Sequence, residues 1–420
     1  MKRIVHLGLG NFHRAHQAWY TFKAGDWKIT GVAMTNAKLQ QEMAASDNKF
    51  LLGTWSQSGL SAEVIDVIDE VILASRQGAL VASKIADETT HIVTVTITEK
   101  GYYLKRGRLD FAATAIAHDL RESAPTSAIG ILAKGLILRF QTSGDPISVV
   151  SCDNLSDNGM KLRRVVSDFI EELCPEALSW IESQVSFPTT MVDRITPRLS
   201  ENAIEEIRTA AGIQTMPVVG TESFSEWVIE DDFAGPHPDW GGAGATIVED
   251  VSAFEQRKLR LLNGAHSFLA YAGLNAGYSY VHEAIVDEEI REGLNRLWEE
   301  ASLTLSGSAA QTATKYQTYL LRRFRVAEMR HSLEQIAMDG SVKLSERLVP
   351  VIRQRASADQ MSPSAELAIK AWARFVVDRI TRGEAINDPN DKRLTDIVRK
   401  NTGDPVEALS KSMLEHDLAD

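Results

Sequence analysis

The chain begins with a short apolar strand that runs straight into a turn containing two glycines. Residues 2–17 read KRIVHLGLGNFHRAHQ, so Gly8 and Gly10 stand between the expected strand Ile4–Leu7 and a segment with helical character. Glycines there let the backbone turn sharply and approach a pyrophosphate, whose charge is met by amides at the start of the helix. The third glycine of this fingerprint would stand at position 13, where the chain has a histidine. The partial motif favours dinucleotide binding, with an ordinary strand-to-helix turn as the alternative.

Strand-like and helix-like stretches alternate over the first part of the chain, up to about Pro197. Alternation of this kind predicts parallel strands joined by helical crossovers, and hence an α/β sheet of the Rossmann type. Several strands end in small or polar residues, and ligands bind beyond the carboxyl ends of such strands. The further expected strands are Ile29–Met34, Ile92–Ile97 and Ile147–Ser151, and the expected helices between them include Leu39–Ala45 and Ala112–Leu120.

The composition of the chain changes after Glu230. Two clusters of glycine and proline fall within residues 235–244, which is typical of a boundary between domains. Beyond Asp250 the strand-like runs largely disappear and helical periodicity prevails. We therefore predict a dinucleotide-binding Rossmann-type domain over 1–245 and a mostly α-helical domain over 246–420. The expected helices of the second domain are Phe254–Ala272, Ile285–Leu303, Ala309–Phe324 and Ala365–Ile380.

The overall balance of residues is that of a soluble globular enzyme. Among 420 residues 44% are hydrophobic and 24% are charged, and the formal net charge of −12 argues against nucleic acid or an anionic membrane as a partner. The two cysteines, Cys152 and Cys174, have neither disulfide nor metal spacing and suit a reducing cytoplasm. No apolar run approaches the roughly 18 residues needed to cross a bilayer. We expect a cytoplasmic monomer or small homo-oligomer that acts on a small molecule.

Two classes of enzyme chemistry lack their motifs in this sequence. His13 and His16 are three residues apart, but no acid follows them at ligand spacing and no HExxH pattern occurs. The GxSxG elbow of a Ser-His-Asp hydrolase is also absent. We therefore expect no metal, and we expect the two histidines to cap the start of a helix or to contact a cofactor or the other domain.

The most reactive-looking cluster is the sequence KLRLLNGAHS at residues 258–267. Asn263 and His266 share a face of a helix, whereas Lys258 lies about 80° around and roughly 12 Å along the axis from His266, so that convergence on one atom requires a bend. A lysine whose pKa is lowered by burial can take or return a hydroxyl proton, and an asparagine amide can stabilise the alkoxide. The alternatives are a solvated basic face over residues 257–260 and a helix end after Asn263.

Three further clusters combine acids, amides and bases. They are SCDNLSDNG at 151–159, MVDRITP at 191–197 and QIAMDGSVK at 335–343. Each has a simple structural alternative: an Asx-rich turn that caps the next helix in the first, a salt-bridged turn in the second, and an Asp-Gly turn in the third. Composition and spacing leave these alternatives open.

Several motifs nevertheless occur together in one order along the chain. They are GLGNFHRAHQ at 8–17, TEKGY at 98–102, CDN at 152–154, MVDRI at 191–195, EWVIED at 226–231 and KLRLLNGAHS at 258–267. In this combination, which runs from Ile4 to about Pro350, the chain resembles the mannitol dehydrogenase family of long-chain, metal-independent polyol dehydrogenases. The resemblance implies an N-terminal Rossmann-type domain that binds NAD(H) and a largely helical substrate and catalytic domain over 246–420, with the substrate between them.

The resemblance also implies roles for single residues. Lys258 resembles the family's general acid/base, and His266 resembles its substrate-orienting histidine. Asn154 and Asn263 match its oxyanion-stabilising pair. The positions that match contacts with the substrate chain are Asp193 and Lys343. The residues expected at the cofactor are Gly8, Gly10, Asn11, Phe12, Asn36, Glu99 and Lys100.

Within the family, residues 330–341 (RHSLEQIAMDGS) are most similar to the D-fructuronate reductases, whereas mannitol-type members tend to carry arginine where Gln335 stands. A hexuronate brings a carboxylate that needs cationic donors, for which Arg330, His331 and Lys343 are the candidates. We therefore expect an NAD(P)-dependent oxidoreductase that interconverts a ketohexuronate and an aldonate, with D-fructuronate and D-mannonate favoured. The alternatives are a polyol dehydrogenase of the mannitol 2-dehydrogenase or arabinitol type, and a non-catalytic sensor of NAD(H) or a sugar acid.

The choice of dinucleotide depends on the end of the second expected strand. Ile29–Met34 is followed by TNAK at residues 35–38, without the acid that holds the ribose of NAD. Asn36 can hydrogen-bond the ribose, whereas Lys38 favours a 2′-phosphate. NAD is the expected cofactor, and NADP is the alternative.

Overall fold

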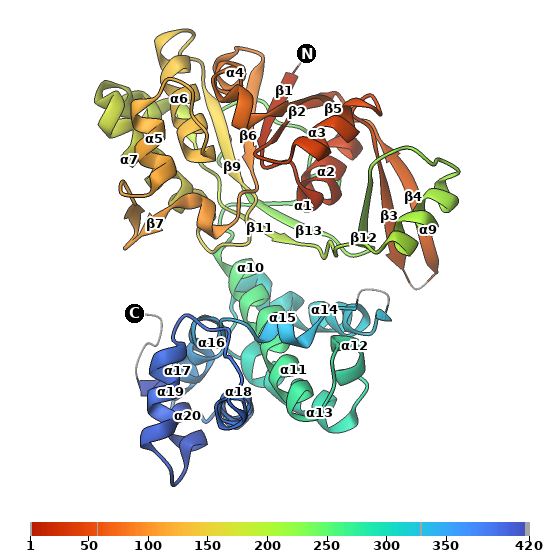
Figure 1. Cartoon of the computed structure of the whole chain (residues 1–420), viewed down its shortest axis with the longest axis vertical. Helices are drawn as coiled ribbons and strands as arrows, with labels where there is room; N and C mark the ends of the chain where they lie inside the picture. Colours follow the sequence, from red (N-terminus) through yellow and green to blue (C-terminus); the bar gives the residue numbers. More distant parts are fainter. Residues whose placement is uncertain (1, 57, 328–329, 416–420) are drawn as a thin grey trace. The chain divides into compact units, whose positions relative to one another are not determined.

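The structure is a computed structural model that describes residues 2–56, 58–327 and 330–415. The chain divides into two compact units, one ending at Val251 and the other beginning at Ser252 (Figure 1). All the assigned strands of the described residues belong to the first unit, and the second is built from helices. The expected fold class, a Rossmann-type α/β part followed by a mostly α-helical part, is therefore confirmed.

The first unit is organised around a six-stranded sheet in which every strand is parallel to its neighbours. From one edge the order is β5-β2-β1-β6-β9-β10, which is 3-2-1-4-5-6 when the six strands are counted along the chain. This is the order of a doubly wound dinucleotide-binding sheet, and its ligand crevice opens beyond the carboxyl ends of the strands where the order reverses, here between β1 and β6. The strands are β1 (Lys2–Leu7), β2 (Trp27–Ala33), β5 (Ile68–Leu73), β6 (Thr90–Val95), β9 (Ile147–Ser151) and β10 (Val185–Ser186).

Helices cover both faces of this sheet, with α1–α3 on one side and α4–α7 on the other (Figure 1). Side chains of a strand alternate between the two faces, so Ile4 packs with α2 and α3 while Val5 and Leu7 pack with α4, α6 and α7. A strand covered on both faces is apolar at nearly every position, which explains the valine and isoleucine runs. The helices are α1 (Asn11–Ala15), α2 (Gln17–Ala24), α3 (Ala37–Ala44), α4 (Ala74–Ala86), η1 (Glu99–Tyr102), α5 (Thr114–Arg121), α6 (Ala128–Gln141), α7 (Asn158–Leu173), η2 (Pro175–Ala177) and α8 (Leu178–Gln184).

The first unit also contains three smaller sheets that the sequence did not predict. In one of them α9 packs closely on β3, because a Cβ at Gly53 would lie only 2.4 Å from the side chain of Ile207. In another, β11 pairs antiparallel with β13 and ends at Asp193. The remaining elements are β3 (Phe50–Ser56), β4 (Gly59–Ile65), β7 (Leu104–Lys105), β8 (Arg108–Leu109), β11 (Thr190–Asp193), α9 (Glu201–Ala211), β12 (Val218–Glu222), β13 (Glu226–Glu230) and β14 (Thr246–Val248).

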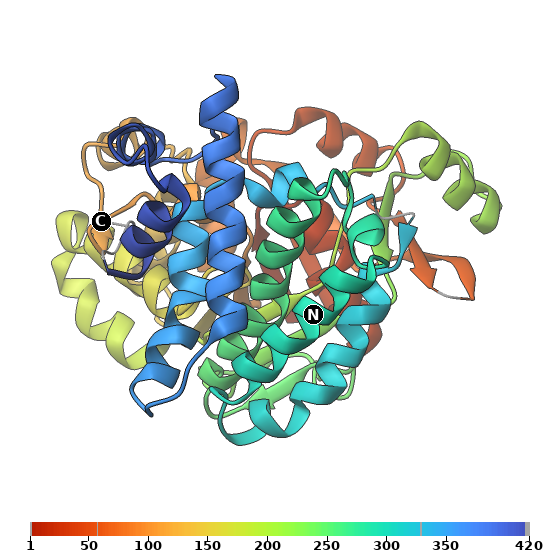
Figure 2. The same ribbon diagram turned by 90° about the horizontal axis from the view of Figure 1, so that it is seen from below.

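The second unit is assembled around α11, which packs against α12, α13, α15, α16 and α18. In Figure 2 this green-to-blue part of the chain consists of helices. A helix that is apolar on all sides is buried, and α11 buries most of its residues, including Phe268 and Tyr271. The elements are α10 (Ser252–Arg257), η3 (Lys258–Asn263), α11 (Gly264–Asn275), α12 (Val281–Ala284), α13 (Glu288–Ser302), α14 (Gly307–Phe324), α15 (Leu333–Ala337), α16 (Gly340–Arg347), α17 (Val349–Ala356), α18 (Pro363–Arg382), α19 (Asp391–Lys400) and α20 (Pro405–Glu415).

Within the described part of the chain, no helix is both long enough and apolar enough to cross a membrane.

Candidate active site

The turn after β1 has the geometry that its glycines allow. Gly8 has φ +102°, and its N–H donates to the carbonyl of Val32 at 3.0 Å. The hydroxyl of Thr96, from the segment after β6, donates to the carbonyl oxygen of Gly8 at 2.9 Å. A Cβ at position 8 would lie 2.0 Å from the carbonyl oxygen of Thr96, so only glycine fits. The turn stands between β1 and β6, at the point where the strand order reverses.

A pair of stacked histidines takes the place of the missing third glycine. His13 of α1 lies on His6 of β1, with ring centroids 3.3 Å apart and planes inclined by 14°, and both side chains are fully buried. The ring nitrogens of His6 lie 2.8 Å and 2.9 Å from the hydroxyls of Thr94 and Thr96. Burial lowers the pKa of His6 to about 3 and lowers the pKa of His13 well below its ordinary value. The two rings are therefore neutral, and they fill the space between helix and strand.

The residues expected near the sugar and phosphates lie at the surface of the turns. Asn11 is exposed, and its Oδ1 accepts a hydrogen bond of 2.8 Å from Arg14. Asn36 is exposed at the start of α3, where its Oδ1 caps the helix by accepting the N–H of Leu39 at 3.0 Å. Lys38 is exposed and lies 3.7 Å from Glu42 on the same helix, so a positive charge stands at this corner.

The ends of β6 and β9 bring three more expected site residues to one edge of the sheet. Glu99 and Lys100 are exposed in the 3₁₀ turn η1, shortly after the end of β6. Asn154 is exposed in the turn after β9, and β9 pairs directly with β6. Asp193 closes β11 and is only 4% exposed. The turn between β9 and α7 is rich in Asp and Asn, but the side chain of its N-cap residue Asp157 does not cap α7, which differs from the capping turn that the sequence left open as an alternative.

In the second unit, the helix that carries Lys258 and Asn263 is not a regular α-helix. Residues Lys258–Asn263 form a π-helical segment that joins α10 to α11. In an α-helix, residues five apart point about 140° away from each other, whereas i→i+5 bonding in a π turn places them one above the other. Lys258 and Asn263, at the two ends of the segment, therefore share a face. His266, three residues further in α11, lies on that face too, so the π turn supplies the irregularity that convergence requires.

Side chains from other helices donate to carbonyls of the π segment. Trp298 donates its indole N–H to the carbonyl oxygen of Leu261 at 2.8 Å. Arg347 donates to the carbonyl oxygen of Asn263 at 3.3 Å and to the hydroxyl of Ser267 at 3.0 Å. Such donors stabilise a segment whose normal i→i+4 bonding is interrupted.

Both structural alternatives for this cluster are wrong. The basic residues over 257–260 do not form a solvated face, since Arg257, Lys258 and Arg260 are 3%, 8% and 9% exposed. The helix does not end after Asn263, because α11 continues directly from Gly264.

Cationic groups gather around His266. Its ring contacts the rings of Phe324 and His331, with centroids 5.1 Å and 4.9 Å away. Burial lowers the pKa of the His266 imidazole well below its ordinary value, so the ring is neutral. Neighbouring basic side chains lower this pKa further, and they are, in decreasing order of effect, His331, Arg323, Arg347 and Lys343. Burial also lowers the pKa of His331 itself, so the positive charge of the group comes from Arg323, Arg347 and Lys343.

Two members of this group, Arg323 and Arg347, were not expected from the sequence. Arg323 belongs to a basic stretch of α14, yet it is only 7% exposed. The burial of Arg323 could have been predicted from its position along the helix. Arg323 follows the buried Tyr316 by seven residues and the buried Leu320 by three, so it falls on the buried face. Arg347 ends α16 and carries no comparable signal.

The other expected substrate contacts of this unit lie in different surroundings. Lys343 is half-buried, and its ammonium donates to the carbonyl oxygen of Ile336 at 3.2 Å, while burial lowers its pKa. Arg330 is exposed, donates to the hydroxyl of Tyr280 at 3.1 Å and stacks over that ring at 5.0 Å. It is not one of the four basic residues with the largest effects on the pKa of His266.

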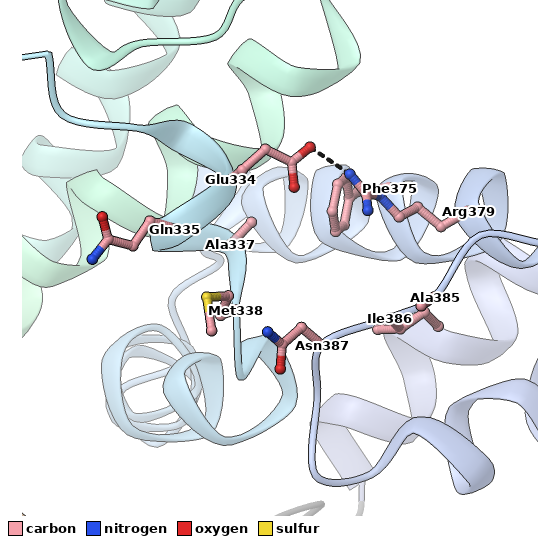
Figure 3. A pocket seen from close by; sticks show the side chains of 9 residues that line it. All are labelled: Glu334, Gln335, Ala337, Met338, Phe375, Arg379, Ala385, Ile386 and Asn387. Atoms are coloured by element: carbon pink, nitrogen blue, oxygen red, sulfur yellow. Dashed lines mark hydrogen bonds and ion pairs between the residues drawn. The ribbon is translucent and has the colours of Figure 1, made fainter.

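A pocket of about 280 Å³ lies between α15, α18 and the segment before α19 (Figure 3). Its wall contains an ion pair between Arg379 and Glu334, with Arg379 stacked over Phe375 at 4.9 Å. Gln335 lines it, but none of the residues expected to catalyse does. Among the described residues there is no group of three or more His, Cys, Asp or Glu side chains placed to bind a metal ion.

Comparison with known proteins places the chain in a family. The sequence profile of the mannitol dehydrogenase Rossmann domain matches residues 2–242, and that of the mannitol dehydrogenase C-terminal domain matches residues 250–420. This chain belongs to the mannitol dehydrogenase family. The resemblance expected from the motifs is thus confirmed, and the chain is an oxidoreductase of that family.

Relatives with different substrates in their names are about equally similar. The D-mannonate oxidoreductase of Escherichia coli is 36% identical over 398 residues, covering 92% of this chain and 82% of the relative. A mannitol 2-dehydrogenase of Phaeosphaeria nodorum is 33% identical, covering 99% of this chain and 76% of the relative.

Two solved structures share the fold. D-sorbitol dehydrogenase in substrate-free form has a TM-score of 0.85 at 27% identity, covering 97% of this chain and 94% of that one. The ternary complex of Pseudomonas fluorescens mannitol 2-dehydrogenase with NAD and D-mannitol has a TM-score of 0.83 at 29% identity, covering 98% and 90%.

Proposed function

We propose that this protein is an NAD-dependent oxidoreductase that interconverts a ketohexuronate and an aldonate, with D-fructuronate and D-mannonate as the pair. The observation that carries the proposal is the cationic group formed by Arg323, Lys343 and Arg347 around the neutral His266. A sugar acid carries a carboxylate that such cations bind by charge-assisted hydrogen bonds, whereas a polyol or fructose has no charge for them to meet. Sequence identity does not separate the two classes, since the relatives named for each are 36% and 33% identical.

The first unit offers a suitable place for NAD. Its sheet has the dinucleotide-binding strand order, and the tight turn at Gly8 opens where that order reverses. We assign Gly8, Gly10, Asn11 and Phe12 to the pyrophosphate turn. Asn36 is assigned to the ribose. Glu99 and Lys100, in the turn after β6, are also assigned to the cofactor. When bound, the nicotinamide accepts a hydride in alcohol oxidation and supplies it in ketone reduction.

Proton transfer is assigned to a residue of the π segment. Stabilisation of the oxyanion is assigned to one residue of the π segment and one of the turn after β9. Lys258 Nζ donates the proton to the reduced carbonyl oxygen, and takes it from the hydroxyl in the opposite direction. The amides of Asn263 and Asn154 donate hydrogen bonds to the developing oxyanion. His266 is held neutral, so one ring nitrogen can accept and the other can donate a hydrogen bond to substrate hydroxyls.

The remaining assignments concern the rest of the substrate. We assign the carboxylate to Lys343 and His331, with Arg323 and Arg347 adding positive charge. Asp193 is assigned to hydroxyl groups of the sugar chain. Arg330 is assigned to the distal end of the substrate.

The substrate class is tested by steady-state kinetics with D-fructuronate, D-tagaturonate and D-fructose, each with NADH. We expect D-fructuronate to have the highest kcat/KM. A highest value for D-fructose would overturn the sugar-acid assignment in favour of a polyol dehydrogenase. Binding of NADH without turnover of any of these compounds would favour a sensor.

The proton-transfer role is tested by Lys258→Ala. We expect kcat to fall by about 10³-fold or more, because general acid–base catalysis contributes 10²–10⁴-fold. The dissociation constant of NADH, measured by fluorescence titration, should stay within about twofold, because Lys258 is not assigned to the cofactor.

The carboxylate assignment is tested by Lys343→Met, which keeps the aliphatic stem and removes the charge. A lost hydrogen bond to a charged group is worth about 1.5–3 kcal/mol, so kcat/KM for D-fructuronate should fall about 10- to 150-fold while that for D-fructose changes little. Lys370→Met is the matched control, because Lys370 lies on α18 and pairs with Glu407 at 3.0 Å. Equal losses for both substrates in Lys343→Met would contradict the assignment.

A further inference from the structure

A buried carboxylate stands next to Asn154, between the segments that follow β6 and β9. Asp153 is 8% exposed. Its Oδ1 accepts the backbone N–H groups of Ile97 and Thr98, each at 2.9 Å, and its Oδ2 accepts the hydroxyl of Tyr102 at 2.9 Å. One side chain of the turn after β9 therefore fixes both ends of the turn after β6.

The contact with Asp153 coincides with the end of β6. The strand ends at Val95, two residues earlier than the sequence predicts, and the N–H groups of Ile97 and Thr98 turn to the carboxylate. Thr98 has φ +64° and ψ 162°, a conformation that a β-branched residue adopts only when its surroundings enforce it. The turn Glu99–Tyr102 follows directly, so the hydrogen bonds to Asp153 determine where that turn begins.

The same network reaches the strand that ends at Asp193. Asn158 donates from Nδ2 to the carbonyl oxygens of Asp153 and Thr190, at 3.0 Å and 2.9 Å. Its Oδ1 accepts the N–H of Thr190 at 3.0 Å, and Thr190 begins β11. Asn158 and Thr190 are buried. A continuous set of hydrogen bonds thus joins the three segments of the first unit that carry Glu99, Asn154 and Asp193.

We propose that Asp153 is a positioning residue for the reaction, because it holds the turn that carries Glu99 and Lys100 in register with the turn that carries Asn154. The inference rests on the proposed function, which assigns those residues to cofactor and oxyanion. Two N–H groups and one O–H all donate to this side chain, and only an ionised carboxylate is an acceptor at both of its polar atoms. An asparagine there would direct an NH₂ group at one of the donors, and the position of the turn after β6 relative to the turn after β9 would no longer be fixed.

The test compares Asp153→Asn with Asp119→Asn. Asp119 is also a buried carboxylate that accepts two backbone N–H groups, those of Thr126 and Ser127, each at 2.8 Å. Its hydrogen bonds tie α5 to the start of α6, and none of its partners is an expected site residue. We expect similar losses of Tm in both variants.

Only Asp153→Asn should lose kcat, by about tenfold or more, because misplacement of reacting groups by about 1 Å costs up to 10²-fold. KM for the sugar acid should change less than about threefold, whereas the dissociation constant of NADH should rise, because the displaced turn carries Glu99 and Lys100. The primary isotope effect with NADH deuterated at C4 should rise in Asp153→Asn, because hydride transfer becomes slower relative to the other steps. Tyr102→Phe removes one of the three donors and keeps both amide bonds, so its loss of kcat should be smaller.

Loss of Tm without loss of kcat in Asp153→Asn, or equal losses of kcat in the two Asn variants, would overturn the positioning role. If Asp153→Asn does not fold, Tyr102→Phe decides: unchanged kcat and isotope effect contradict the proposal. If the parent enzyme turns over no sugar acid or polyol, the proposed function fails separately. Hydrogen exchange of the backbone amides then tests the inference. Exchange over 97–102 and 154–158 that is at least tenfold faster in Asp153→Asn, but not in Asp119→Asn, supports it. Unchanged exchange in Asp153→Asn overturns it.

Discussion

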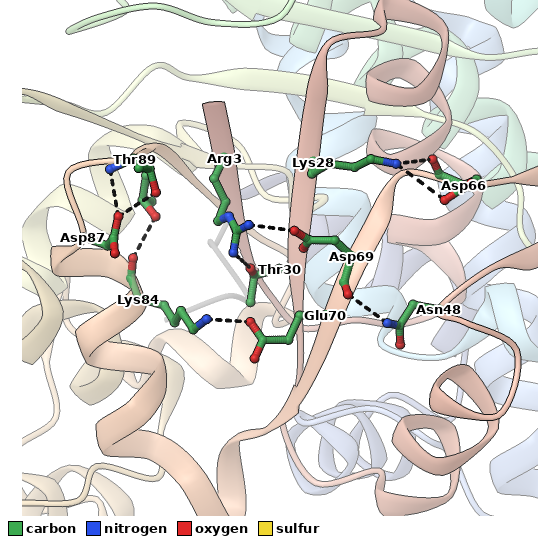
Figure 4. A network of polar contacts seen from close by, with 11 residues as sticks. Arg3, Lys28, Thr30, Asn48, Asp66, Asp69, Glu70, Lys84, Asp87 and Thr89 are labelled. Carbon is green, nitrogen blue, oxygen red and sulfur yellow. Dashed lines mark hydrogen bonds and ion pairs between the residues drawn. The ribbon is translucent and has the colours of Figure 1, made fainter. Parts of the chain in front are cut away.

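At the amino ends of the strands of the six-stranded sheet, charged side chains meet in partly exposed ion pairs, whereas at the carboxyl ends a set of polar side chains that includes His6, His13 and Asp153 is buried beneath the exposed residues of the turns. Figure 4 shows the amino edge, where Arg3 pairs with Asp69 at 2.8 Å and Lys84 with Glu70 at 2.7 Å, all with side chains 24–38% exposed. At the carboxyl edge, the stacked histidines and the network of Asp153 are enclosed by the fold. The expected cofactor and oxyanion residues of this unit lie at the second edge.

The two kinds of contact differ in what happens when a partner is lost. An exposed ion pair contributes about 0–1 kcal/mol and is screened by salt, because water replaces the missing partner. A buried donor or acceptor left without a partner costs about 1–3 kcal/mol, because no water reaches it. The amino edge therefore tolerates substitution, and the carboxyl edge holds its turns in one geometry.

The largest expected effect comes from adding one methyl group at each edge. In Gly8→Ala the new Cβ would lie 2.0 Å from the carbonyl oxygen of Thr96, at φ +102°, so the turn and β6 must separate. Gly25→Ala adds the same methyl group before β2, at φ +70° with no atom within 4 Å, so it isolates the cost of the backbone conformation, about 1–3 kcal/mol.

We expect the free energy of unfolding in urea to fall by at least about 2 kcal/mol more in Gly8→Ala than in Gly25→Ala, because overpacking adds about 1–3 kcal/mol to the conformational cost. NADH binding should be lost in Gly8→Ala and kept in Gly25→Ala. Equal behaviour of the two variants would mean that the close contact with Thr96 does not control the turn.

Acid should weaken the carboxyl edge through its stacked histidines. Burial lowers the pKa of His6 to about 3 and that of His13 well below its ordinary value, so the folded protein binds fewer protons than the unfolded chain below about pH 6.5. Stability is therefore lost as the pH falls below 6.5. Each histidine should contribute a loss of about 1.4 kcal/mol between pH 7.5 and 5.5.

His13→Phe separates this effect from other titrating groups. A phenyl ring can keep the stack on His6, so the substitution removes the titrating group and, besides it, only a weak contact of the His13 ring with the side chain of Gln17. The variant should lose about 1.4 kcal/mol less than the parent between pH 7.5 and 5.5. An unchanged pH dependence in urea denaturation would show that His13 does not titrate with unfolding.

The difference between the edges also explains what the sequence could predict. The central strands were found because they are rich in β-branched residues and buried on both faces, as at residues 92–95 of β6. Strands such as Thr246–Val248 were missed because they are too short to carry a period and pair with segments distant in sequence. The hairpin of β3 and β4 was missed although each strand has seven residues. The alternation of elements was enough for the fold class, since connections between parallel strands need helices.

The sequence predicted some residues of the site but not the backbone geometry that places them. The motifs indicated Lys258, Asn263 and His266, but the π turn that aligns the first two has no pattern of its own, because it depends on donors such as Trp298 and Arg347. Asp153 was visible only as part of a turn. Its partners Ile97 and Thr98 are more than 50 residues away and are backbone groups, which no side-chain pattern reports.

The smallest expected effect is at the amino edge. Arg3→Met removes the ion pair with Asp69 and a long hydrogen bond of 3.5 Å to the hydroxyl of Thr30, while the methionine keeps most of the aliphatic stem. Because these side chains are partly exposed, the free energy of unfolding should fall by less than about 1 kcal/mol, and the difference from the parent should shrink between 50 and about 500 mM salt. NADH affinity should not change, since the contact lies at the opposite ends of the strands from the turn at Gly8. A loss of affinity in Arg3→Met without a matching loss of stability would mean that strain at the amino ends of β1 and β5 is transmitted along the strands, and the two edges would then have to be treated as one coupled unit.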